Sequence, residues 1–160
     1  MRKAWVLFLV LGLILVGCGQ KAEQPAAKQA VQKIDEKEII RKAADRYLTT
    51  APDNWRIVKP EWLKEKIDSG QTADIFILDV RPDFMYAEGH IKGAVNIPLK
   101  TLCKKENLQK LPEGKQIVLI CVSGHTASMA NAILNMLGYN AVTMKGGMNA
   151  WKAAGYPVEK

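Results

Sequence analysis

The chain contains an apolar run, Ile117-Val118-Leu119-Ile120, that leads directly into the short segment Cys121-Val122-Ser123-Gly124-His125-Thr126. Four consecutive branched apolar residues predict a strand that is buried on both faces, as strands of parallel sheets are. A helical pattern follows from Thr126 to Leu137, and its expected core face consists of Ala130, Ile133, Leu134 and Leu137. The short segment is therefore predicted to be a strand-to-helix loop with Cys121 at its base.

The same alternation of strands and helices extends on both sides of this unit. Strands are predicted at 56–58, 75–80, 94–97 and 141–144. Helices are predicted at 60–67, at 82–87, around 104–111 and in a last segment that bears Trp151 and ends at Gly155. Alternating strands and helices predict an α/β domain with a largely parallel central sheet.

The residue types in the loop suit thiol chemistry. In open α/β sheets, ligands bind beyond the carboxyl ends of the strands, where Cys121 lies. Loop amides and the positive end of the following helix would stabilise a thiolate, which is the reactive form of cysteine. Gly124 permits a tight curl, and Ser123 and Thr126 offer hydroxyl donors. Two alternatives remain open: Cys121 as a buried inert thiol, and His125 as an exposed residue rather than one that tunes the loop's charge.

Three stretches resemble the motifs of the rhodanese (sulfurtransferase) family. The first runs from Leu78-Asp79-Val80-Arg81 through Glu88-Gly89-His90-Ile91 to Asn96-Ile97-Pro98. The second is the loop from Cys121 to Ala127, and the third comprises Lys145-Gly146-Gly147, Trp151 and Gly155-Tyr156-Pro157. The resemblance covers roughly residues 55–158. It implies a rhodanese-like three-layer fold, in which a mostly parallel central sheet is flanked by helices.

The resemblance also implies an activity. The Cys121 thiolate would take sulfane sulfur from thiosulfate, mercaptopyruvate or a persulfide donor and hold it as a Cys121 persulfide. A thiol, cyanide or a protein acceptor would then remove the sulfur, with no metal or organic cofactor. Arg81 would either face the anion site or form a structural salt bridge with Asp79 or Asp83. The residues expected to bind substrate are Arg81, Val122, Ser123, Gly124, His125, Thr126 and Ala127.

The loop departs from one family pattern, and two competing functions follow from the comparison of motifs. Many thiosulfate-using rhodaneses carry a basic residue after the catalytic cysteine, where this chain has Val122, so the donor remains open. Related phosphatases and arsenate reductases use Cys-x5-Arg, but the sixth residue after Cys121 is Ala127. A non-catalytic docking module is the remaining alternative, against which the presence of Cys121 argues.

The first residues predict export rather than a place in the fold. Arg2 and Lys3 precede an apolar run, Ala4–Val16, that is shorter than the about 20 residues needed to span a bilayer. This pattern indicates a secretory signal, the alternative being an uncleaved membrane anchor. The segment Leu15-Val16-Gly17-Cys18 resembles the lipobox of bacterial lipoproteins, which implies cleavage before Cys18 and lipidation of its thiol.

The chain is accordingly divided into four parts: a signal peptide at 1–17, a flexible tether at 18–34, a helix at 35–50 and the rhodanese domain at 51–160. The apolar face of the helix is expected to pack on the domain, and a partner-binding helix is the alternative. The protein is expected to be exported and lipid-anchored to the cell membrane or the outer membrane, facing the periplasm or the cell exterior.

The composition and the remaining cysteine complete the sequence evidence. A 48% hydrophobic content and 24% charged residues are typical of a globular chain and exclude a wholly disordered one. The net charge of +7 comes from scattered lysines without a basic stripe, so no nucleic-acid partner is expected. Cys103 is expected to be a bystander thiol, although a disulfide with Cys121 is possible in principle.

Overall fold

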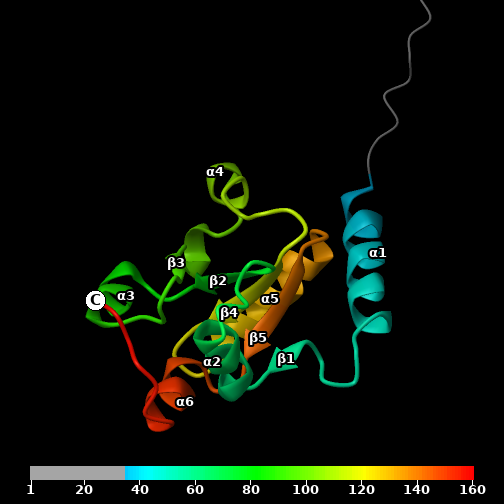
Figure 1. Cartoon of the computed structure of the whole chain (residues 1–160). Helices are drawn as coiled ribbons and strands as arrows, with labels where there is room; N and C mark the ends of the chain where they lie inside the picture. The colour runs from blue at the N-terminus through cyan, green and yellow to red at the C-terminus, as the bar shows by residue number, and fades with distance from the viewer. Residues whose placement is uncertain (1–34) are drawn as a thin grey trace, which may run out of the picture. The chain divides into compact units, whose positions relative to one another are not determined.

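The computed structural model describes residues 35–160, and the signal peptide, tether and lipidated Cys18 predicted from the sequence lie outside the described residues. Five strands form one sheet in the order β1-β5-β4-β2-β3, and every neighbouring pair is parallel (Figure 1). The strands are β1 (Ile57–Val58), β2 (Ile75–Asp79), β3 (Val95–Asn96), β4 (Gln116–Ile120) and β5 (Asn140–Met144). The helices are α1 (Glu36–Thr49), α2 (Pro60–Asp68), α3 (Asp83–Glu88), the 3-10 helix η1 (Leu99–Thr101), α4 (Lys105–Leu108), α5 (His125–Met136) and α6 (Gly147–Ala153).

Helices cover both faces of the sheet, which gives the three-layer α/β fold predicted from the sequence. Successive side chains of a strand point to opposite faces, so β4 contributes to two cores. Val118 and Ile120 pack in the core under α2 and α6, together with Leu63 and Trp151. The core on the other face, under α5 and the η1–α4 segment, contains Ile117, Leu119, Cys121, Ala127, Ala130, Leu134, Leu102 and Leu111.

A buried amide ties α5 to the strands beneath it. Asn131 is 2% exposed, and its Nδ2 donates to the Thr143 hydroxyl at 3.0 Å and to the Arg56 carbonyl at 3.1 Å. The Arg56 carbonyl also accepts the amide of Thr143 at 2.8 Å. Because buried polar groups are costly unless they are hydrogen-bonded, these contacts fix the approach to β1 relative to α5 and β5.

The core face predicted for α5 is correct in its middle and wrong at its end. Ala130 and Leu134 are fully buried, and Ile133 is half-buried. Leu137, which was expected in the core, is 54% exposed because the helix ends at Met136 and Leu137 is already its C-cap residue. The helix also begins at His125, one residue earlier than the sequence pattern predicts.

The helix expected at residues 35–50 is α1, which packs against α5 along part of its apolar face. Ala43 and Tyr47 are half-buried there, whereas Ile39 and Ile40 are 56% and 64% exposed. The Nη2 of Arg46 donates to the carbonyl of Met136 at 2.8 Å. Within residues 35–160, no helix has the length and apolar composition that a bilayer crossing requires.

The largest buried side chain provides a test of this packing. Trp151 is 1% exposed and its indole Nε1 donates to the carbonyl of Pro157 at 2.8 Å. We expect Trp151→Ala to lower the free energy of unfolding by about 3–5 kcal/mol, because it leaves a large cavity under α6. Urea denaturation would measure this, with Trp55→Ala as control, since Trp55 is 60% exposed. Equal losses from both substitutions would contradict the packing.

Candidate active site

Cys121 lies directly after β4, on the side of the sheet that α5 covers. Its side chain follows the alternation set by Ile117 and Leu119, and the residue is 1% exposed. The amide of Gly124 donates to the Cys121 Sγ at 3.1 Å. The first N–H groups of a helix have no partner within the helix, and Gly124 is the N-cap of α5. The sulfur therefore lies at the positive end of α5, where a thiolate is stabilised.

The loop residues divide into buried and exposed positions. Gly124 and Ala127 are buried, whereas the side chains of Val122, Ser123, His125 and Thr126 face solvent. Gly124 has a φ of +89°, in the left-handed region that favours glycine, as expected for a tight curl. A Cβ at this position would lie 3.2 Å from the backbone nitrogen of Gly146, so the loop also approaches the start of α6 closely.

The first turn of α6 holds the loop through backbone hydrogen bonds. The amide of Met148 donates to the carbonyl of Cys121 at 2.8 Å, and the amide of Asn149 donates to the carbonyl of Val122 at 2.9 Å. Gly147 makes this approach possible, because a Cβ there would lie 2.8 Å from both the carbonyl carbon and the oxygen of Val122. Gly146 and Gly147, at the start of α6, belong to the third motif, but the motif alone does not indicate this positioning role. Their adjacency at a strand-to-helix turn is the signal that could have revealed it.

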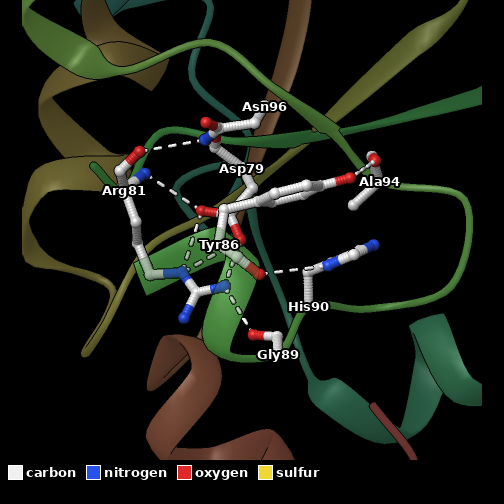
Figure 2. Close-up of polar contacts among 7 residues, drawn as sticks. All are labelled: Asp79, Arg81, Tyr86, Gly89, His90, Ala94 and Asn96. Carbon is white, nitrogen blue, oxygen red and sulfur yellow. Dashed lines mark hydrogen bonds and ion pairs between the residues drawn. The ribbon is translucent and has the colours of Figure 1, made fainter. Parts of the chain in front are cut away.

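Arg81 forms a buried ion pair with Asp79 (Figure 2). Asp79 is 0% exposed and Arg81 is 5% exposed. The Nε of Arg81 donates to the Asp79 carboxylate at 2.9 Å, and its Nη2 donates to the carboxylate at 2.6 Å and to the Gly89 carbonyl at 2.9 Å. Of the roles that the sequence left open, the structure shows the salt bridge, and its partner is Asp79 rather than Asp83. A contact of Arg81 with substrate stays a prediction.

A polar network around this pair joins β2, α3 and β3 (Figure 2). The Nδ2 of Asn96 donates to the carbonyls of Asp79 and Arg81, both at 2.9 Å. The Tyr86 hydroxyl donates to the carbonyl of Ala94. Burial, and then the charge of Asp79, raises the pKa of Tyr86 above its ordinary value, so the hydroxyl remains a neutral donor.

His90 belongs to the same network rather than to the cysteine loop. Its ring stacks on Tyr86 with 3.8 Å between centroids, and its Nδ1 lies 3.1 Å from the Tyr86 carbonyl. Its backbone pairs with Glu159 near the end of the chain. These contacts give His90 a role in packing and turn geometry.

The two cysteines of the described region are not joined. Cys103 is exposed in the turn between η1 and α4, whereas Cys121 is buried, and both thiols are free. The disulfide that the number of cysteines permits is therefore absent between them. Cys121 is available as the thiol that the loop surrounds.

Comparisons with known proteins agree with this architecture. The family model described as the rhodanese-like domain matches residues 59–154. YtwF of Bacillus subtilis is 35% identical over 95 residues, which cover 59% of this chain and 88% of that protein. A sulfurtransferase of Allochromatium vinosum is 30% identical over 88 residues, which cover 54% of this chain and 80% of that protein. Other matched relatives are longer proteins, of which the chain spans less than half.

A solved structure shows the same relationship in three dimensions. The crystal structure of a rhodanese-related protein from Thermoplasma volcanium superposes with a TM-score of 0.56 at 32% identity. The superposition covers 64% of this chain and 95% of that protein. The family model itself matches more than half of the chain, from the residue before α2 through the end of α6. The chain therefore belongs to the rhodanese-like domain family.

Proposed function

We propose that this protein is a sulfurtransferase that carries sulfane sulfur as a persulfide on Cys121. Membership of the rhodanese-like family and the relative named as a sulfurtransferase support sulfur transfer in general. One observation carries the specific proposal: the Gly124 amide donates to the Cys121 Sγ at the N-terminal end of α5. The amide donor and the N-terminal end of α5 both face the sulfur, which is the arrangement that favours nucleophilic attack by a cysteine on a donor.

The proposed reaction consists of two displacements at sulfur. In the first, the Cys121 thiolate attacks the sulfane sulfur of the donor, the donor's sulfur–sulfur or carbon–sulfur bond breaks, and the remainder leaves with the electron pair. With thiosulfate the leaving group is sulfite. In the second, an acceptor thiolate or cyanide attacks the outer sulfur, and the Cys121 thiolate leaves.

Backbone amides supply the electrostatic stabilisation in this proposal. The outer sulfur of a persulfide carries negative charge at neutral pH, and we expect it to accept from N–H groups of the first turn of α5, which begins beside the Cys121 sulfur. Arg81, which follows the neighbouring strand β2, is already neutralised by Asp79. We therefore expect thiosulfate, a dianion, to be a poorer donor than mercaptopyruvate or a persulfide.

We further propose that the protein is exported and anchored through lipid on Cys18. The basic start, the short apolar run and the residues before Cys18 support this proposal. As a flexible chain, the 17 residues from Cys18 to Ile34 would give a root-mean-square separation of about 23 Å between the lipidated cysteine and the domain. A protein or small-molecule sulfur acceptor at the membrane surface would then be within reach.

The central test is mass spectrometry of the purified protein after incubation with thiosulfate, mercaptopyruvate or polysulfide. We expect an increase of about 32 Da, one sulfur atom, on Cys121. Cys121→Ser should abolish the adduct, whereas the control Cys103→Ser should retain it, because Cys103 is exposed and lies outside the loop. If no donor modifies Cys121, the domain is a docking module and the proposal is wrong.

The contact between α6 and the loop gives a second prediction. We expect Gly147→Ala to lower the rate of sulfur transfer by at least about tenfold, because the new Cβ displaces the Cys121–Val122 backbone. Gly155→Ala is the matched control, since Gly155 also has a positive φ but its Cβ would meet nothing within 4 Å. Rates measured on the folded fraction of each variant would separate the two. Equal rates for both would show that the contact does not position the cysteine.

Membrane fractionation tests the lipid anchor. We expect Cys18→Ala to lose the lipid and to keep an uncleaved signal, because the lipid precedes cleavage in lipoproteins; mass spectrometry of the membrane fraction measures both. If the variant is processed normally or stays lipid-modified, Cys18 is not the lipid site. A wild-type protein found in the membrane without lipid would instead identify the apolar run as a true anchor.

A further inference from the structure

A cavity lies at the end of α5 that is far from Cys121. Its volume is about 360 Å³, and it lies between the end of α1, the residue before β1 and the connection from α5 to β5. The 12 residues of α5 span about 18 Å, so this cavity is distinct from the cysteine loop. The residues that line it include two arginines and no carboxylate: Arg46, Tyr47, Thr50, Arg56, Asn135, Gly138, Tyr139 and Asn140.

Neither arginine forms an ion pair within residues 35–160. Each guanidinium contacts a helix end through its Nη2: that of Arg46 donates to the Met136 carbonyl, and that of Arg56 donates to the Thr50 carbonyl at 3.3 Å and to the Thr50 hydroxyl at 3.5 Å. The Nε of Arg56 is buried and has no hydrogen-bond partner. Asp53 lines a neighbouring cavity that Arg56 also borders, and it forms no ion pair within residues 35–160.

Capping of the helix ends accounts for only part of this charge. The carboxyl ends of α1 and α5 each carry a partial charge of about −0.5, so two guanidinium groups leave a net charge of about +1. The two carbonyl contacts use one nitrogen of each guanidinium, although each group has five N–H donors. The Nε of Arg56 is closed to solvent, so contact with a ligand in the cavity falls to the Nη groups of the two arginines.

The backbone around Arg56 has an unusual conformation that several hydrogen bonds fix. Trp55 and Arg56 have φ values of 51° and 58°, in the left-handed region that bulky residues rarely occupy. The Arg56 carbonyl accepts from Thr143 and Asn131, and its amide donates to the Asn54 side chain at 3.1 Å. Strained backbone that surrounding contacts fix in this way is a feature of ligand sites.

We propose that this cavity binds a phosphate group. Two guanidinium forks can engage up to four oxygen atoms, which a phosphate supplies, whereas the two oxygens of a carboxylate satisfy a single fork. A water molecule occupies about 30 Å³, so the cavity also accommodates part of the organic group attached to the phosphate. The phosphate belongs either to a soluble phosphate ester or to a phospholipid headgroup. The inference does not rest on sulfur transfer.

The test uses the full chain reconstituted in phosphatidylcholine nanodiscs and titrated with glycerol 3-phosphate. We expect saturable binding by calorimetry that Arg46→Gln and Arg56→Gln each weaken by at least about tenfold. Arg41→Gln is the matched control, because Arg41 lies on α1, as Arg46 does, but forms an ion pair with Glu38 at 2.7 Å and does not line the cavity. In the wild type and in Arg46→Gln, the NMR resonance of the Arg56 Nε–H should shift on binding, which locates the ligand even if Arg56→Gln fails to fold.

A second arm replaces part of the phosphatidylcholine by phosphatidylglycerol. A shift of the Arg56 resonance in these nanodiscs, with a weak response to glycerol 3-phosphate, would support the site and identify a lipid headgroup. Binding of glycerol 3-phosphate with no effect of phosphatidylglycerol would support the site and identify a soluble ester. The proposal is overturned if neither ligand moves the resonance, or if Arg41→Gln weakens binding as much as the cavity variants do.

Discussion

The hydrogen bond from the amide of Met148 to the carbonyl of Cys121 is the contact on which the candidate site depends. It joins the turn after β5 to the turn after β4, so the loop is held from one side by α6 and continues into α5 on the other. The contact requires the backbone at position 147 to lie directly against the backbone of Val122, and only glycine permits this approach. The geometry around the sulfur therefore comes from main-chain atoms rather than from a set of reactive side chains.

The buried pair of Asp79 and Arg81 supports the neighbouring strand end without adding charge to the site. Arg81 reaches from the end of β2 to the Gly89 carbonyl after α3, and Asn96 joins the same strand end to β3. A buried pair of this kind is weak evidence for net stability, because desolvation offsets much of the attraction. Its effect here is geometric: it fixes the carboxyl end of β2 beside β4, the strand that leads into Cys121.

Much of the fold was predictable because its central strands are continuous apolar runs and its helices have clear periodicity. The predicted burial of Leu137 was wrong because periodicity does not show where a helix ends. The exposure of Ile39 and Ile40 was not predictable either, because it depends on how far α5 covers α1. The position of Cys121 followed from its place after a strand. The left-handed backbone of Arg56 was not predictable, because bulky residues normally avoid it and the contacts that fix it come from residues far along the chain.

Buried and exposed residues alternate along residues 121–127, and this pattern affects which positions can change as the sequence of such a domain evolves. Cys121, Gly124 and Ala127 are buried at intervals of three, and they pack against the scaffold. The positions between them, Val122, Ser123, His125 and Thr126, project outward. Substitutions at the outward positions change what an approaching molecule meets while leaving the thiol's support intact. Evolution can thus alter partner choice in this loop without rebuilding the chemistry beneath it.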